Sequence, residues 1–249
     1  MDSSNATTNS RVPIRQQGEH GAIVFDTGLW QQADSAFFDP AHYADQAKPV
    51  NGKGGRGAAW FVKAEFGDAV LRHYRRGGWA AKLSDVRYLW RDESSVRSIH
   101  EFNFMQSLRE KKLPVPKPVA AMYSRRGLFY RAAILVERIP NALSFLDCMH
   151  QQTESAPWAA LGKIIAGFHK AGARHADLNA QNILLDADQK IWLIDWDKAQ
   201  FQTKAGPWCI EVLQRLQRSL MKYRGEVSEQ TIQSGMQILR VAHDTEMER

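Results

Sequence analysis

The chain has 249 residues, of which 44% are hydrophobic and 24% are charged, as in an ordinary globular protein with a substantial core. Its two cysteines stand in unrelated contexts without a CxxC spacing, which argues against a disulfide framework and against a zinc site. The formal net charge of +6 favours an anionic partner but does not separate a nucleotide, a nucleic acid and an anionic lipid.

The N-terminal segment MDSSNATTNS is polar and lacks the apolar core of an ordinary secretory signal. No later run approaches the roughly 20 apolar residues that a membrane-spanning helix needs. We therefore expect an intracellular protein in which residues 1–18 form a disordered tail.

Strand-like stretches separated by glycines dominate the first half of the chain, and we assign residues 19–138 to a first domain. Runs of this kind predict a domain rich in antiparallel β-structure. The stretches are residues 22–25, 60–62, 69–71, 119–123 and 129–138.

One helix interrupts these strands, at about residues 95–111. Its apolar side chains, placed at about 100° per residue, cover well over half of the helical circumference, which predicts a mostly buried helix. Glu101 falls inside this apolar arc, where burying a carboxylate alone would cost several kcal/mol. Glu101 therefore needs a cationic or hydrogen-bonding partner.

The second half, residues 139–249, is predicted to be mostly helical around one small hairpin. Ser155 is a candidate helix cap with Pro157 in the first turn, and the apolar stripe that follows ends at Gly172. Further helical segments are expected at about residues 209–224 and from about residue 228.

The predicted hairpin follows the motif HADLNAQN, residues 175–182. Two short apolar runs, residues 183–185 and 191–194, flank the polar turn DADQ. If residue 184 faces about residue 191, Asn182 lies near residue 193, and Asp195 follows within one or two positions. We therefore expect Asn182 and Asp195 to lie close together.

An amide oxygen and a carboxylate that meet at a strand edge form a hard oxygen site suited to Mg²⁺, which takes few protein ligands together with phosphate oxygens and waters. Asp177 precedes Asn182 in the same loop, where it could accept a proton from an attacking hydroxyl. Each of these residues alone could equally stabilise a loop or end a strand. Their joint occurrence favours phosphoryl transfer.

At these residues the sequence resembles the protein-kinase-like superfamily, whose catalytic loop reads H-x-D-x-x-x-x-N and whose metal-binding aspartate ends a nearby strand. The resemblance implies that Asp177 is catalytic and that Asn182 and Asp195 bind metal. The sequence departs from the pattern at Ala176 and at the pair that follows Asp195, Trp196-Asp197. Asp197 is either a further metal ligand or a solvated turn acid.

The first half matches the same superfamily less closely. The segment GKGGRG, residues 52–57, lies between strand-like runs and could cover the phosphates of ATP. Arg72 stands where the superfamily usually has a lysine, and Glu101 is its candidate partner on the helix. Lys53 or Lys63 could share the role of Arg72. The nucleotide-binding residues implied are Gly52, Gly54, Gly55, Gly57, Arg72 and Glu137, with Arg72 and Glu101 also assigned to catalysis.

Four stretches resemble the lipopolysaccharide kinase family in particular: residues 55–62, 70–78, 113–118 and 175–184. The similarity spans roughly residues 20 to 240. Few residues follow Asp195, which leaves little room for a peptide-docking segment, so we expect an acceptor other than a protein.

The resemblance implies an α+β, bilobal protein-kinase-like fold, with an antiparallel N-lobe sheet plus one helix and a mostly helical C-lobe that holds a small catalytic hairpin. It implies transfer of the γ-phosphate of ATP, with Mg²⁺, to the 4-hydroxyl of 3-deoxy-D-manno-octulosonic acid (Kdo) on a lipid A precursor. It also implies a peripheral protein, expected as a monomer, at the cytoplasmic face of a bacterial inner membrane.

Other functions stay open. The acceptor could be a heptose or an aminoglycoside-like molecule, and the missing lysine and glycine leave room for a pseudokinase scaffold. A nucleic-acid-binding module fits poorly, because the basic residues are not interleaved with aromatics. The basic amphipathic segment at residues 212–224 is typical of a membrane-surface helix, but more often such a stripe packs on its own domain.

Overall fold

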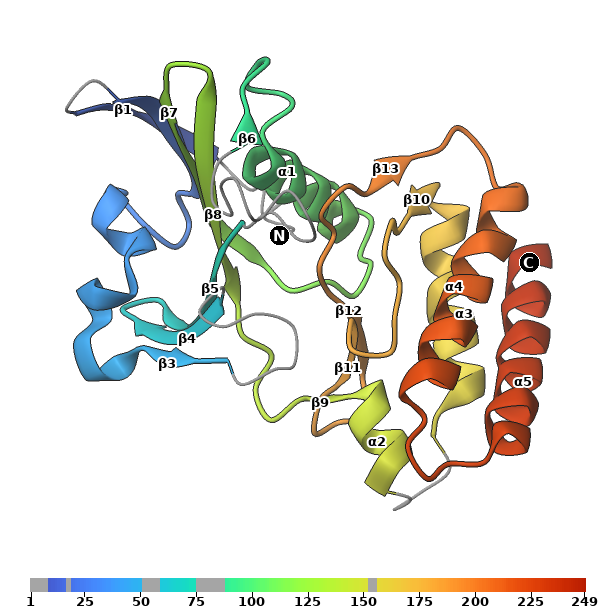
Figure 1. Cartoon of the computed structure of the whole chain (residues 1–249). Coiled ribbons are helices and arrows are strands. Elements are labelled where there is room, and N and C mark those ends of the chain that lie inside the picture. Colours follow the sequence, from blue (N-terminus) through green and yellow to red (C-terminus); the bar gives the residue numbers. More distant parts are fainter. Residues whose placement is uncertain (1–8, 17–18, 51–58, 75–87, 152–155) are drawn as a thin grey trace, which may run out of the picture. The chain divides into compact units, whose positions relative to one another are not determined.

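The computed structural model of the chain describes residues 9–16, 19–50, 59–74, 88–151 and 156–249. The chain divides into two compact units, one made of residues 1–106 and 117–138 and the other of residues 107–116 and 139–249 (Figure 1). The boundary after residue 138 is the same as in the sequence analysis. Residues 107–116, however, belong to the second unit and not to the first.

The first unit is built on an antiparallel sheet with the strand order β1-β2-β7-β8-β5-β4-β3, in which β6 also pairs with β8. Its strands are β1 (Asn9–Gln16), β2 (Glu19–Asp26), β3 (Lys48–Pro49), β4 (Ala59–Ala64), β5 (Gly67–His73), β6 (Tyr88–Leu89), β7 (Pro118–Arg126) and β8 (Phe129–Glu137). Its helices are η1 (Ser35–Phe38), η2 (Pro40–Gln46) and most of α1 (Arg97–Glu110).

Strand β1 corrects the prediction of a disordered tail up to residue 18. Each of its residues pairs with a residue of β2, from Asn9 with Asp26 to Gln16 with Glu19. This strand can form despite its polar sequence because backbone hydrogen bonds to β2 stabilise it. Val12 and Ile14 also pack against an apolar cluster of the first unit. Composition alone therefore did not indicate it.

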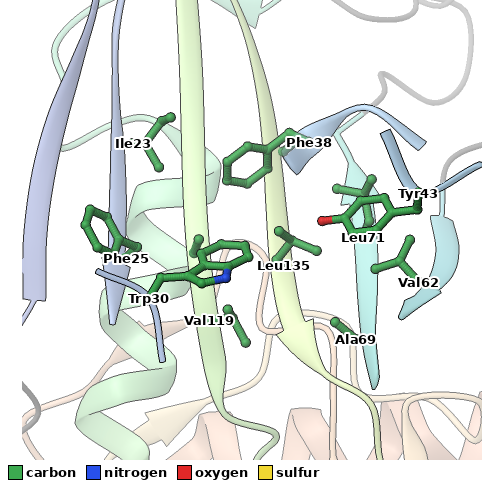
Figure 2. Packing of buried hydrophobic residues seen from close by; sticks show 12 residues of the cluster. Ile23, Phe25, Trp30, Phe38, Tyr43, Val62, Ala69, Leu71, Val119 and Leu135 are labelled. Atoms are coloured by element: carbon green, nitrogen blue, oxygen red, sulfur yellow. The ribbon is translucent and has the colours of Figure 1, made fainter. Parts of the chain in front are cut away.

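The sheet of the first unit carries an apolar cluster on each face, because successive side chains of a strand point to opposite sides. In β2, Ile23 and Phe25 join one cluster, whereas Ala22 joins the other. The first cluster includes Trp30, Phe38 and Tyr43 from the segment that contains η1 and η2 (Figure 2). The second includes Val96, Ile99 and Phe102, from α1 and the residue just before it, which confirms the predicted mostly buried helix.

The second unit contains a three-stranded sheet in the order β12-β11-β9, a two-stranded pair β10-β13, and helices. The strands are β9 (Leu143–Ser144), β10 (Ala173–Arg174), β11 (Ile183–Leu185), β12 (Ile191–Leu193) and β13 (Gln200–Phe201), and the helices are α2 (Phe145–Gln151), α3 (Trp158–Lys170), α4 (Pro207–Tyr223) and α5 (Glu229–Glu248). Among the described residues, no helix has both the length and the apolar character needed to cross a bilayer.

Helices α3 and α5 approach each other closely at Gly162. A Cβ atom at this position would lie 2.2 Å from the carbonyl oxygen of Leu239 in α5. The start of α3 differs slightly from the prediction, since Pro157 occupies the cap position and not the first turn. The predicted cap, Ser155, lies outside the described residues.

Gly162→Ala is expected to destabilise the protein by about 1–3 kcal/mol, because the added methyl group overpacks the contact with α5. Gly167→Ala is the matched control in the same helix, since its Cβ atom would meet only Leu113 Cδ2, at 3.6 Å. The control should be neutral or stabilising by up to about 1 kcal/mol, because alanine favours a helix over glycine. Urea unfolding of both variants measures the difference, and equal stabilities would contradict the close approach.

Candidate active site

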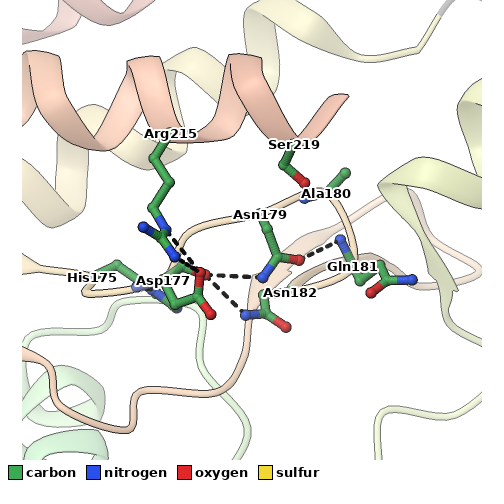
Figure 3. A network of polar contacts seen from close by, with 8 residues as sticks. All are labelled: His175, Asp177, Asn179, Ala180, Gln181, Asn182, Arg215 and Ser219. Carbon is green, nitrogen blue, oxygen red and sulfur yellow. Dashed lines mark hydrogen bonds and ion pairs between the residues drawn. The ribbon is translucent and has the colours of Figure 1, made fainter. Parts of the chain in front are cut away.

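The loop between β10 and β11 holds the polar motif predicted to be catalytic. The side-chain amides of Asn179 and Asn182 both donate to the carbonyl oxygen of Asp177, each at 3.1 Å (Figure 3). The side chain of Asn179 also accepts from the amide of Gln181 at 2.9 Å. These bonds fix the loop around Asp177 and leave the carboxylate of Asp177 exposed at its surface.

His175 connects this loop to the end of β12. Its Nδ1 atom accepts a hydrogen bond from the amide of Asp177 at 3.1 Å, so the ring proton lies on Nε2, which donates to the carbonyl oxygen of Ile194 at 3.0 Å. Burial lowers the pKa of His175 below its ordinary value, which keeps the imidazole neutral and preserves this arrangement. One buried ring therefore positions both chain segments.

The predicted hairpin is present, with a register one residue away from the prediction. Leu184 pairs with Trp192, and Leu185 pairs with Ile191. The turn is one residue longer than predicted, because it also includes Lys190. The amide of Asp186 donates to the carbonyl oxygen of Lys190 and closes this turn.

The changed register brings Asn182 opposite the residue that precedes Asp195. The amide of Ile194 donates to the carbonyl oxygen of Asn182 at 3.0 Å. The side-chain NH₂ of Asn182 is committed to Asp177, and its amide oxygen is turned away from that bond (Figure 3). Among the described residues, no hydrogen bond to this oxygen is recorded, so it is a suitable hard ligand for a cation.

Asp195 adopts a φ angle of 63°, in the left-handed region that residues other than glycine rarely occupy. The next residue, Trp196, is fully buried and donates from Nε1 to the carbonyl oxygen of Leu193 at 3.0 Å. Its ring also packs against His175, with a centroid distance of 4.6 Å. The backbone on both sides of Asp195 is thus held, and the residue is half-buried.

Asp197, the further candidate ligand, is also half-buried. Within the part of the chain that the structure describes, no three His, Cys, Asp or Glu side chains gather into a metal-binding group. The predicted pair of Asn182 and Asp195 is of a different type, because Asn182 would bind an ion through an amide oxygen. Such a pair fits an ion that completes its shell with water and phosphate.

Arg215 was not singled out by the sequence, although it contacts the predicted base directly. From α4, its Nε atom donates to Oδ1 of Asp177 at 2.8 Å, and its Nη2 atom donates to the same oxygen. One helical turn further, the hydroxyl of Ser219 accepts from the amide of Ala180 at 3.3 Å. The only signal in the sequence was the basic face of this amphipathic segment.

The first unit contains the predicted pair of Arg72 and Glu101. The guanidinium of Arg72 forms an ion pair with Glu101, whose side chain is 2% exposed. The hydroxyl of Tyr74 donates to the same carboxylate oxygen, a contact that the sequence did not indicate. Glu101 thus has the cationic partner that its place in an apolar arc required.

The structure says less about the other residues predicted to bind nucleotide. Glu137 is exposed at the end of β8 and accepts from the amide of Lys117 at 3.2 Å. Lys63 is exposed on β4. The glycine-rich segment, with Gly52, Gly54, Gly55 and Gly57, and the neighbouring Lys53 lie outside the described residues.

Comparison with known proteins identifies a family whose members resemble this chain. The model of the lipopolysaccharide kinase (Kdo/WaaP) family matches residues 41–238. The chain is similar to the 3-deoxy-D-manno-octulosonic acid kinase of Stenotrophomonas maltophilia (strain K279a), with 49% identity over 98% of this chain and 96% of that protein. It is similar to the kinase of the same name from Xanthomonas oryzae pv. oryzae (strain PXO99A), with 47% identity over 95% of each chain.

His175→Phe is expected to lower the free energy of unfolding at neutral pH by about 1–3 kcal/mol, because it leaves the carbonyl of Ile194 and the amide of Asp177 without their partner. The loss should shrink as the pH falls below about 6.5, where the unfolded wild-type histidine protonates and the buried native one does not. Urea unfolding of both proteins from pH 8 to pH 5 measures this, and a loss that stays constant with pH would contradict a buried neutral imidazole.

Proposed function

Because this chain belongs to the lipopolysaccharide kinase (Kdo/WaaP) family, and is therefore a phosphotransferase that acts on an alcohol group, we propose that it is a Kdo kinase. In this proposal ATP is the donor, and the acceptor is the 4-hydroxyl of Kdo on a Kdo-lipid A precursor. The observation that carries the proposal is near full-length similarity to proteins named Kdo kinase, combined with the loop that presents Asp177.

We further propose that the two units correspond to the lobes of a protein-kinase-like fold. The antiparallel sheet and single long helix of the first unit support an N-lobe that binds nucleotide. The mainly helical second unit, with its small sheet, supports a C-lobe that carries the catalytic loop. Gly52, Gly54, Gly55 and Gly57 would then cover the phosphates, and Glu137 would contribute to nucleotide binding.

Asp177 is the proposed general base, which accepts the proton of the acceptor hydroxyl. That oxygen forms a bond to the γ-phosphorus while the bond from this phosphorus to the bridging oxygen of ADP breaks. Arg215 binds Oδ1 of Asp177, and the hydrogen bonds recorded for the described residues leave Oδ2 to receive the proton. Most of the rate enhancement would come from holding these groups in place.

Asn182 and Asp195 are the proposed ligands of Mg²⁺, with Asp197 as a third candidate. When bound, Mg²⁺ neutralises charge on the transferred phosphate. The protein orients these side chains before the ion binds. The amide oxygen of Asn182 is oriented by the bond of its NH₂ group to Asp177, and Asp195 by the buried Trp196 beside it.

A peripheral location at the cytoplasmic face of the inner membrane, as a monomer, completes the proposal. The net charge of +6 supports contact with an anionic glycolipid and with the acidic surface of a membrane.

Asp177→Asn is expected to reduce kcat by about 100-fold or more, because general base catalysis typically contributes 10²–10⁴-fold. Nucleotide binding should be retained. Mass spectrometry of a Kdo-lipid A precursor incubated with MgATP measures the added phosphate, and fragmentation locates it on the sugar.

Asp188→Asn is the matched control, since Asp188 is an exposed acid in the turn between β11 and β12. It should retain wild-type turnover. An acceptor that carries heptose but no Kdo tests the substrate. Phosphorylation of that acceptor alone, or full turnover by Asp177→Asn, would contradict the proposal.

Arg72→Met is expected to destabilise the protein by about 3 kcal/mol, near the lower end for breaking a buried ion pair, because Arg72 is partly exposed. It should also raise KM for ATP at least about 10-fold, through loss of a charge-assisted contact to phosphate. Arg72→Lys keeps the charge and should retain most activity. Arg131→Met, at an exposed position of β8, is the control. An unchanged KM in Arg72→Met would refute a role for Arg72 at the nucleotide.

A further inference from the structure

The face of α4 that meets the catalytic loop does so through two side chains. Arg215 binds the carboxylate of Asp177, and Ser219, one turn away, binds the loop backbone at Ala180. The adjoining face of the helix is apolar and buried, with Val212, Leu216 and Leu220 among its residues. The helix is therefore held by its core face and presents Arg215 to the loop in a defined position.

The guanidinium of Arg215 uses only part of its hydrogen-bonding capacity. Its Nε and Nη2 atoms both donate to the single oxygen Oδ1 of Asp177. For Nη1, no partner is recorded among the described residues, and the side chain is 47% exposed. An arginine that is anchored through one edge and open along the other can bind a second planar anion with two parallel hydrogen bonds.

Stability does not account for this contact. The side chains of Arg215 and Asp177 are 47% and 54% exposed, and ion pairs between such exposed groups contribute little to folding.

We propose that Arg215 binds the carboxylate of the acceptor sugar while it holds Asp177, so that one guanidinium aligns the acceptor with the base. This inference rests on the proposed function, because Kdo is an acid whose carboxylate is ionised at neutral pH. Among the described residues, Arg215 is the arginine recorded in an ion pair with the proposed base, Asp177. Arg215 would thus select a sugar acid over a neutral sugar.

The test compares two acceptors, the Kdo-lipid A precursor and its methyl ester at the Kdo carboxyl group. For wild-type protein, esterification should reduce kcat/KM by about 10- to 150-fold, the range expected for losing a hydrogen-bonded contact between charged groups. Arg215→Gln should lose a similar factor with the acid acceptor, and should discriminate less than about 5-fold between acid and ester. Arg215→Lys should fall between the two.

Arg240→Gln is the matched control, since Arg240 is an exposed arginine of α5 whose Nη2 atom donates to Gln217 at 2.7 Å. It should discriminate like the wild type. A thermal unfolding curve establishes that each variant is folded, as expected for changes at exposed positions.

Two outcomes overturn the inference while the proposed function stands. Arg215→Gln could lose equal factors with both acceptors, which would mean that Arg215 acts only on Asp177, or wild-type protein could use acid and ester equally well. A wild-type protein that transfers phosphate to neither acceptor would instead refute the proposed function, and the inference with it. If wild-type protein and Arg240→Gln prefer the acid acceptor, and Arg215→Gln uses acid and ester about equally, the result supports both the inference and the proposed function.

Discussion

The two hydrogen bonds of His175 join the segments on which the proposed chemistry depends. One bond holds the amide of Asp177, and the other holds the carbonyl of Ile194, immediately before Asp195. The arrangement requires a neutral ring, because a neutral imidazole has one donor and one acceptor, whereas a protonated ring has two donors. Burial supplies that condition by lowering the pKa of His175, and Trp196 packs against the ring to maintain it.

The Arg72–Glu101 ion pair of the first unit and the Asp177–Arg215 ion pair of the second unit differ in burial, and this difference matches their proposed roles. Glu101 is almost fully buried beside Arg72 and Tyr74, so losing its partner would leave a charge in a medium that solvates it poorly. The buried pair of Arg72 and Glu101 is therefore suited to hold both side chains in a fixed position. The pair of Asp177 and Arg215 is half exposed, so its groups can take up ligands at small cost to folding.

The basic amphipathic sequence of α4 was compatible with a membrane-surface helix and with a helix that packs on its own domain. Its apolar stripe of Val212, Leu213, Leu216 and Leu220 is buried within the second unit, as for a helix that packs on its own domain. Part of the basic face is used locally, because Arg215 meets Asp177. The positive charge of the chain therefore has at least one role beyond general attraction of anions, namely orienting the proposed base.

The sequence by itself determined the hairpin after the HADLNAQN motif, the buried helix and the need of Glu101 for a partner, because each depends on spacing within a short segment. It also indicated the motif that we propose to be catalytic. The tertiary structure decided the contact of Arg215 with Asp177, the register that sets Asn182 opposite Ile194, and the pairing of β1. Arg215 and Asp177 are 38 residues apart, so no local pattern links them. The register depends on the backbone conformation of one turn, and β1 depends on hydrogen bonds to a neighbouring strand. Hydrophobic periodicity indicates neither of these.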